Sequence, residues 1–513
     1  MNKSIEWIKR LVRLSINEVS SEENRIENLM ELKEEYIGFS RVDQEHIKNI
    51  MMTQFEINDL LYVLSMMLLY TKEKPFVRML LETIEKGDFD CYIGSMLECQ
   101  IMIHIKDEYV WKKMFHRKNM YKYSQILDIN YPYIPRTNRM QKRVVIVVGQ
   151  LLAVNHAPTR MVLEIAYVLQ VYMGYEIILF SCPCDGELPQ DLWYGFCGKE
   201  NSIQKFKDTP MRIEHRGKIF RGYQINMGSS SCKEYSMMLS LIYAWNPMFV
   251  LDCATGNSVV GIAGTFTTLA SLPMSLECPV SEGEILIRIG RMDEEKEEEY
   301  AKAIGENQTQ LFLKEKFPVV IETSFNTYFR ADMQLPDERF LVAIVGNRLN
   351  VEISEDFVQT MKRILEKRTN VDFVIIGKGE GLETFFDDEL FYGHIHYLGF
   401  CEDLLGIYQI LDLYLNPKRG GGGFSSAMAL VAGIPVVTLP DCDVAYNCGE
   451  EFIVQDYGEM VDIVCRYTED KDFYNEKRSY AKSYKQRNDE EQLIRFVKEM
   501  VEGILKIMEK QER

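Results

Sequence analysis

The chain has 513 residues, and at roughly 100–200 residues per domain it should contain about three domains. Apolar residues make up 46% and charged residues 27% of it, which is globular rather than disordered composition. Its net charge of −18 opposes the approach of a polyanion, so nucleic acid is not expected as a partner.

No targeting or membrane segment is expected. The first 18 residues lack the sustained apolar run and the small-residue cleavage site of a signal peptide. The longest apolar stretch, at 60–70, is shorter than the ~20 residues that a transmembrane helix needs. The 12 cysteines are scattered, without paired CxxC motifs, which favours reduced thiols. We therefore expect a cytoplasmic protein with no transmembrane segment.

The N-terminal quarter of the chain has a helical pattern. Apolar residues recur there at helical spacing, as in Ile5, Ile8 and Leu11, while glycine and β-branched runs are sparse. We predict an all-α domain over residues 1–130. The aperiodic Tyr- and Pro-rich segment at 123–139 marks its boundary with the next domain.

Short β-rich runs then alternate with helical stretches, which is typical of a parallel sheet with crossover helices. The run RVVIVV at 143–148 predicts a buried strand, and a helix that opens with proline is expected at 158–172. Further strands are expected at 176–181 and 248–253. These elements predict a Rossmann-like domain over residues 140–335.

A second series of the same kind fills residues 336–513, with helices from about residue 457 onward. Its strands are predicted at 340–346, 371–379, 394–400, 413–417 and 434–440. Two such domains in tandem imply a cleft at the carboxyl ends of their strands, where open α/β sheets bind ligands. The expected fold is therefore α/β, with two Rossmann-like domains facing a cleft and an all-α domain before them.

The segment at 413–440, LYLNPKRGGGGFSSAMALVAGIPVVTLP, carries the clearest chemical signal. A strand ends at Pro417, four glycines follow, and a helix begins near two serines. Glycines let the backbone approach a phosphate, and a helix N-terminus offers free N–H donors, so we predict a diphosphate site. Its expected ligands are Lys418, Arg419, Gly421, Gly422, Gly423, Ser425 and Ser426. The alternative is a flexible turn whose serines only cap the helix.

This segment resembles the donor-diphosphate loop of the GT-B glycosyltransferases. It is most similar to that of the protein O-GlcNAc transferases and of the bacterial cytoplasmic N-glucosyltransferases that modify adhesins. Those families have a glycine and paired Thr or Asn/Thr at the helix start, then a small-residue helix and a G-x-P-V-V strand. The resemblance covers both Rossmann-like domains in layout but only two or three motifs in detail.

The resemblance implies an inverting, metal-independent hexosyltransferase that needs no cofactor beyond its nucleotide sugar, with a UDP-sugar as the expected donor. It places Asn347 and Arg348, which follow the strand at 341–346, at the donor phosphates. It also places the backbone of Leu398, Gly399 and Phe400 at the nucleobase.

Two positions depart from the family pattern. Met428 stands where the retaining members have a glutamate, and Ala429 stands where the O-GlcNAc-type enzymes have the aspartate that holds the ribose. Asp443, or else Asp441 or Glu450, could take over the ribose contact. The two aspartates of Asp441-Cys442-Asp443 could also be read as a metal-binding pair, but that pair belongs to a fold without a second Rossmann-like domain.

An inverting transferase needs a group that accepts a proton or orients the acceptor. His156 lies between the strand at 143–148 and the next helix, and its ordinary pKa near 6.5 suits proton transfer. Asp252 ends another strand at the same edge. We predict both as catalytic residues; the alternative for each is a side chain that caps the following helix.

The predicted function is transfer of a sugar from a nucleotide sugar to a protein or peptide, which the helical domain helps to hold. A UDP-sugar epimerase has the same double-Rossmann architecture but rarely needs such a helical domain. A non-catalytic partner subunit of a glycosyltransferase complex fits the missing ribose aspartate, whereas the intact glycines and serines count against it.

Overall fold

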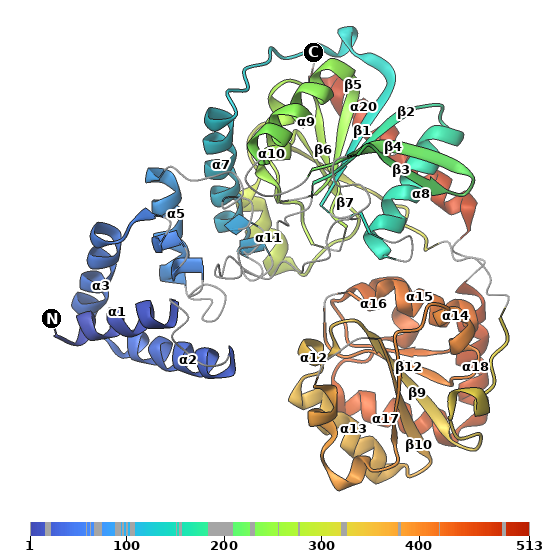
Figure 1. The fold of residues 1–513 in the computed structure, drawn as a ribbon. Helices are drawn as coiled ribbons and strands as arrows, with labels where there is room; N and C mark the ends of the chain where they lie inside the picture. Colours follow the sequence, from blue (N-terminus) through green and yellow to red (C-terminus); the bar gives the residue numbers. More distant parts are fainter. Residues whose placement is uncertain are drawn as a thin grey trace. The chain divides into compact units, whose positions relative to one another are not determined.

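The chain folds into two compact units (Figure 1). Unit 1 comprises Met1–Lys314 and Val497–Arg513, and unit 2 comprises Glu315–Phe496, so unit 2 is inserted into unit 1. The computed structural model describes residues 2–15, 22–57, 59–61, 63–65, 74–87, 94, 97–98, 101–102, 108–149, 151–152, 156–182, 209–225, 231–254, 256–274, 277–319, 326–377, 381–419, 421–484 and 489–511.

The first part of unit 1 is helical and has an apolar core of its own. Its helices are α1 (Asn2–Ser15), α2 (Glu22–Gly38), α3 (Arg41–Gln54), α5 (Lys74–Lys86) and α7 (Tyr109–Ile126). Trp7 is fully buried there, and its Nε1 donates a 2.8 Å hydrogen bond to the carbonyl of Leu32. Phe115 of α7 packs in this core, whereas Tyr123 of the same helix packs in the core of the following sheet. Helix α7 therefore joins the helical part to the sheet.

The rest of unit 1 is built on a sheet that is parallel except for one hairpin. Within the described residues its strand order is β3 (Met211–His215), β4 (Lys218–Gln224), β2 (Glu176–Ser181), β1 (Met140–Val148), β5 (Pro247–Cys253), β6 (Leu269–Ser271), β7 (Ile285–Arg288) and β8 (Thr309–Phe312). Only the hairpin of β3 and β4 is antiparallel. The β-branched run of β1 is buried, as its sequence predicts, and Val147 is in register with Asp252 of β5.

Helices cover this sheet. They are α8 (Ala157–Val171), α9 (Ser231–Trp245), α10 (Ser258–Gly261), α11 (Glu294–Ala303) and part of α20 (Glu490–Gln511), with short 3-10 turns η1 (Arg136–Asn138) and η3 (Ile262–Thr265). Side chains of α9 and α10, such as Met238 and Val259, share one apolar core with Val145 of β1 and Val250 of β5. This packing fixes the ends of β1 and β5, where the predicted catalytic residues lie.

Unit 2 has a second sheet, parallel throughout its described strands. The order is β11 (Ile395–Gly399), β10 (Val371–Gly377), β9 (Phe340–Gly346), β12 (Leu413–Leu415) and β13 (Val436–Val437). The last two strands are shorter than predicted. In β13 the flanking Pro435 and Pro440 have no N–H to donate to a ladder. Strand β11, at one edge of the sheet, is only partly buried, whereas β13 at the other edge is buried.

Helices pack on both faces of this sheet. They are α12 (Leu349–Glu352), α13 (Glu355–Lys367), α14 (Leu404–Tyr408), α15 (Gly423–Ala432), α16 (Asp443–Cys448), α17 (Tyr457–Glu469) and α18 (Lys471–Lys482). The 3-10 turns are η4 (Ala331–Met333), η5 (Leu382–Phe386), η6 (Glu389–Phe391) and η7 (Glu450–Phe452). One core joins α13 and α17 to Val342, and a second joins α14, α15 and α16 to Leu341. Neighbouring residues of β9 thus point to opposite faces, and the sheet is doubly wound.

Helix α20 begins in unit 2 and ends in unit 1. Phe496 packs edge-on against Phe317 in unit 2, with ring centroids 5.2 Å apart. In unit 1, the carboxylate of Glu499 accepts a 3.0 Å hydrogen bond from the backbone N–H of Lys314. Among the described residues, no helix combines the length and the apolarity that crossing a membrane would require.

Candidate functional site

A glycine turn joins β12 to α15 at the carboxyl edge of the sheet in unit 2. Gly421 and Gly422 have φ angles of +97° and +82°, in the left-handed region that favours glycine. Gly422 is the N-cap of α15 and, as a glycine, has no side chain with which to cap the first N–H groups of this helix. A Cβ atom on Gly423 would lie 2.5 Å from Nδ2 of Asn447, so a larger residue here would require the Asn447 side chain to move. The turn therefore brings backbone N–H groups to the start of α15 without side chains of its own.

The two predicted serine ligands make local hydrogen bonds. The hydroxyl of Ser425 donates to the carbonyl of Gly422 at 2.9 Å and lies 3.2 Å from the hydroxyl of Tyr414. Ser426 is fully buried, and its hydroxyl donates to the carbonyl of Gly423 at 2.9 Å. Both hydroxyls thus brace the turn. That either one binds phosphate stays a prediction, and Ser425 is the more accessible of the two.

Arg348 is an exposed cation at this turn. It follows β9 at the N-cap position of α12, and its side chain is 59% exposed. A Cβ atom on Gly421 would lie 3.8 Å from Nη2 of Arg348, so the guanidinium lies beside the glycine turn. Asn347, which precedes it, is exposed as well. The structure thus brings together the two motifs, at 347–348 and 421–423, that the sequence predicts as parts of one phosphate site.

Arg419 has a different position from the one expected of a phosphate ligand. Its side chain is only 4% exposed, and Nη1 forms an ion pair with Glu352. Nη2 donates to the carbonyl of Val345 at 2.6 Å, and Nε donates to Oδ1 of Asn416 at 3.0 Å. Arg419 therefore ties the end of β9 to the end of β12 from inside the fold. Lys418, its neighbour, is exposed.

Sequence reasoning missed Glu352, which accepts from both Arg348 and Arg419. The spacing of Arg348 and Glu352, four residues apart, was the available signal, since such pairs meet on a helix.

The remaining predicted donor residues lie at or near the same edge. Asp443 is the first residue of α16, and a Cβ atom on Gly423 would lie 3.3 Å from its Cβ. Leu398 and Gly399 end β11, three places away from β12 in the sheet, and Phe400 is 49% exposed after them. Asp443 is therefore adjacent to the glycine turn, whereas the proposed base-binding backbone lies at the far end of the sheet edge.

His156 is at the N-cap position of α8 in unit 1, yet its side chain makes no capping hydrogen bond. Its Nδ1 lies 2.9 Å from the hydroxyl of Thr159, which also accepts a 2.8 Å hydrogen bond from the backbone N–H of Leu152. Burial lowers the pKa of His156 below its ordinary 6.5. The imidazole is therefore neutral at pH 7 and able to accept a proton.

Asp252 lies at the carboxyl end of β5 and is buried. Its Oδ1 accepts a 2.9 Å hydrogen bond from the backbone N–H of Ala254, and Oδ2 accepts one of 3.0 Å from the hydroxyl of Ser271. Burial raises the pKa of Asp252 to about 6. This bonding suits an acid that stabilises the turn after its strand, and a catalytic role for it stays a prediction.

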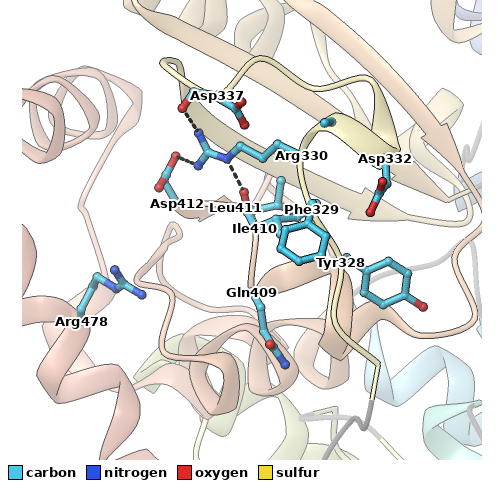
Figure 2. Close-up of a pocket in the computed structure, with 11 residues that line it drawn as sticks. Tyr328, Phe329, Arg330, Asp332, Asp337, Gln409, Ile410, Leu411, Asp412 and Arg478 are labelled. Carbon is cyan, nitrogen blue, oxygen red and sulfur yellow. Dashed lines mark hydrogen bonds and ion pairs between the residues drawn. The ribbon is translucent and has the colours of Figure 1, made fainter.

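A separate hollow of about 630 Å³ lies at the opposite, amino edge of the sheet in unit 2 (Figure 2). Arg330 lines it and donates to the carbonyl of Ile410 at 2.9 Å and to the carboxylate of Asp412 at 2.8 Å. Asp412 immediately precedes β12, whereas the glycine turn follows that strand. The hollow is therefore not part of the glycine-turn site.

Comparisons with known proteins agree with this geometry. Residues 339–470 match the family model described as Glycosyl transferases group 1. A mutant O-GlcNAc transferase from Thermobaculum terrenum is similar over 99% of this chain and 98% of its own, with 12% sequence identity and a TM-score of 0.53. HepE from Anabaena, solved with UDP and glucose, aligns over 71% of this chain and all of its own, at 14% identity and a TM-score of 0.49. No curated protein sequence matches the chain significantly.

The fold is that of the GT-B glycosyltransferases, as the sequence predicts. The segment of unit 2 that matches the group 1 glycosyltransferases runs from β9 to α17 and contains both Arg348 and the glycine turn. These findings together support sugar transfer as the reaction class.

Proposed function

We propose that the protein is a glycosyltransferase that binds a UDP-sugar at the glycine turn of unit 2 and transfers the sugar to a protein or peptide. The observation that carries the proposal is the exposed guanidinium of Arg348 beside Gly421, close to the N-terminus of α15. Backbone N–H groups at the positive end of a helix, together with a guanidinium, complement a diphosphate.

The same groups would stabilise the leaving group. In an inverting transfer the acceptor oxygen or nitrogen attacks the anomeric carbon, and the bond from that carbon to the diphosphate breaks. The diphosphate leaves with an added negative charge, which Arg348 and the N–H groups of the turn stabilise. We propose that these groups do so without a metal ion.

His156 is the proposed base for the acceptor proton. When Nδ1–H donates to the hydroxyl of Thr159, Nε2 carries the free electron pair, and the lowered pKa keeps the ring neutral until it takes the proton. The proton of the attacking hydroxyl or amide then moves to Nε2 as the new glycosidic bond forms.

The donor and the acceptor are proposed on different grounds. The name of the Thermobaculum terrenum protein, whose fold is similar, favours an N-acetylglucosamine donor. The protein acceptor rests on the resemblance of the glycine segment to that of the protein O-GlcNAc transferases. The UDP moiety rests on the resemblance of the loop at 398–400 to the base-binding loops of that family, and a cytoplasmic location would suit such a donor. A non-catalytic partner subunit is the second candidate, because Ala429 stands where the family holds the ribose.

Two measurements test the proposal together. UDP should raise the melting temperature, because a ligand that binds only the folded state stabilises it by RT ln(1 + [L]/Kd), and EDTA should leave this shift unchanged. A panel of nucleotide sugars, incubated with the protein and a mixture of peptides, should then release the nucleoside diphosphate of one donor. A UDP-induced shift without any release would favour the partner subunit, and no shift with any nucleoside diphosphate would contradict the donor site.

A further inference from the structure

Glu352 connects an exposed arginine to a buried one. Its Oε1 lies 3.0 Å from Nη2 of Arg348, and its Oε2 forms an ion pair with Nη1 of Arg419. The Glu352 side chain is 10% exposed, between 59% for Arg348 and 4% for Arg419. One carboxylate thus serves two guanidinium groups at different depths in the fold.

The charges of the three side chains leave one positive charge at the surface. Arg419 cannot turn outward, because its remaining nitrogens donate to Val345, Asn416 and the hydroxyl of Tyr414. Its buried charge is compensated by Glu352. Arg348 therefore keeps a full positive charge available to an anion while one of its nitrogens is held by the same carboxylate.

The position of Glu352 is set by neighbours on both sides. Leu349, the first residue of α12, and Ile353, which follows the helix, are buried in the core that α13 and α17 form. Exposed Arg–Glu pairs four residues apart usually add little because both side chains are free to move. Here Glu352 is already fixed by the core and by Arg419, so only the side chain of Arg348 loses conformational freedom when the pair forms.

We propose that Glu352 is a positioning residue that holds the guanidinium of Arg348 beside the glycine turn, ready for the diphosphate of the donor. Arg419 cancels the charge of Glu352, so that the carboxylate does not repel the phosphates. This role rests on the proposed function, since it acts only if a nucleoside diphosphate binds at the turn.

A double-mutant cycle tests the role with UDP as the probe. The wild type, Arg348→Ala, Glu352→Gln and the double variant are compared by calorimetric titration, well below each variant's melting temperature. Each single change should weaken UDP binding, Arg348→Ala by about tenfold or more, since it removes a charge-assisted hydrogen bond. The double variant should bind UDP as Arg348→Ala does, because Glu352 acts through Arg348.

Matched variants separate positioning from a general effect. Glu491→Gln removes the partner of Arg495 from an exposed pair of the same spacing and should leave UDP affinity unchanged. Glu352→Asp keeps a charge for Arg419 but retracts it by one methylene group, and it replaces Glu352→Gln if that variant does not fold. It should show the same coupling to Arg348.

The outcomes distinguish two failures. Suppose that the wild type binds UDP and that the affinity losses of the two single variants multiply in the double variant. This result would overturn the role of Glu352 and leave the donor site intact. Unchanged UDP affinity in Glu352→Gln would do the same. A wild type that binds no nucleoside diphosphate would overturn the proposed function itself, and with it this role.

Discussion

The two sheets begin with the same local pattern and use it differently. In each unit an arginine follows the first strand of a parallel series, and a glutamate follows four residues later: Arg160 and Glu164 after β1, Arg348 and Glu352 after β9. In unit 1 the glutamate is 2% exposed and the arginine 16%. In unit 2 the glutamate is 10% exposed and the arginine 59%.

The difference comes from the other partners of each glutamate. Glu164 also contacts His215 at 3.2 Å and Arg216 at 3.1 Å, both at the hairpin of β3 and β4. All the side chains of this cluster are therefore mostly buried. Glu352 instead forms its second ion pair with Arg419, which is buried, and Arg348 stays exposed to solvent. One Arg-x-x-x-Glu pattern thus yields a structural cluster in unit 1 and an exposed cation in unit 2.

The largest expected effect is on the glycine turn. In Gly422→Val the new Cβ would lie 2.9 Å from Nη2 of Arg419 and 3.2 Å from Val444, at a φ of +82° that valine avoids. UDP binding should be lost in a titration of the purified variant. Gly393→Val is the control, because Gly393 also has a positive φ but no atom within 4 Å of its Cβ position. Equal UDP affinity in the two variants would place the diphosphate elsewhere.

His156→Ala tests whether unit 1 supplies the base. Transfer should fall by about a hundredfold or more, the scale of lost general base catalysis, while UDP affinity stays nearly unchanged. Because burial lowers the pKa of His156, the wild-type rate should fall with decreasing pH only below 6.5, where the ring takes up a proton. This acidic limb should vanish in the variant. Parallel losses of binding and transfer would instead assign His156 to the donor side.

Glu164→Gln tests the structural nature of the cluster in unit 1. Removing the buried carboxylate leaves Arg160 and Arg216 without their anion, so the free energy of unfolding should fall by about 3 kcal/mol. Glu176→Gln, which breaks the exposed pair with Arg143, should cost under about 1 kcal/mol in the same denaturant titration. UDP affinity should be unchanged in both Glu164→Gln and Glu176→Gln. Weaker UDP binding in Glu164→Gln would contradict the purely structural role of Glu164 that distinguishes it from Glu352.

The effect confined to one part of the pH range is a gain in stability from Asp252→Asn. The folded state raises the pKa of Asp252 from its ordinary 3.8 to about 6, so ionisation of the buried group destabilises the fold as the pH rises through that range. The variant should gain up to about 3 kcal/mol near pH 8 and under about 1 kcal/mol near pH 4. Chemical denaturation at both values checks it. A gain in stability that does not change with pH would rule out ionisation of Asp252 as its cause. Loss of sugar transfer with intact UDP binding would instead assign Asp252 a catalytic role.

The sequence predicted the parts of the molecule that local patterns determine. The buried β-branched run of β1, the glycine turn before α15 and the two Rossmann-like sheets all follow from neighbouring residues. The burial of Arg419 does not, because its partners Glu352 and Val345 lie 67 and 74 residues away in the chain. The hydroxyl of Ser426 looked available for the same reason: its burial depends on packing between helices that sequence spacing alone does not reveal.

The path of α20 has a consequence for biosynthesis. Because residues 497–511 belong to unit 1, while unit 2 is continuous from 315 to 496, unit 2 can finish folding before unit 1 has all of its residues. The side chain of Leu311 in β8 packs against Gly503 of α20. A Cβ atom on Gly503 would lie 2.6 Å from Cδ1 of Leu311, so the absence of a side chain there allows this close contact. During translation, Leu311 therefore lacks this contact until α20 has been made, and a nascent chain that stalls within unit 2 would leave unit 1 incompletely packed and accessible to chaperones or proteases.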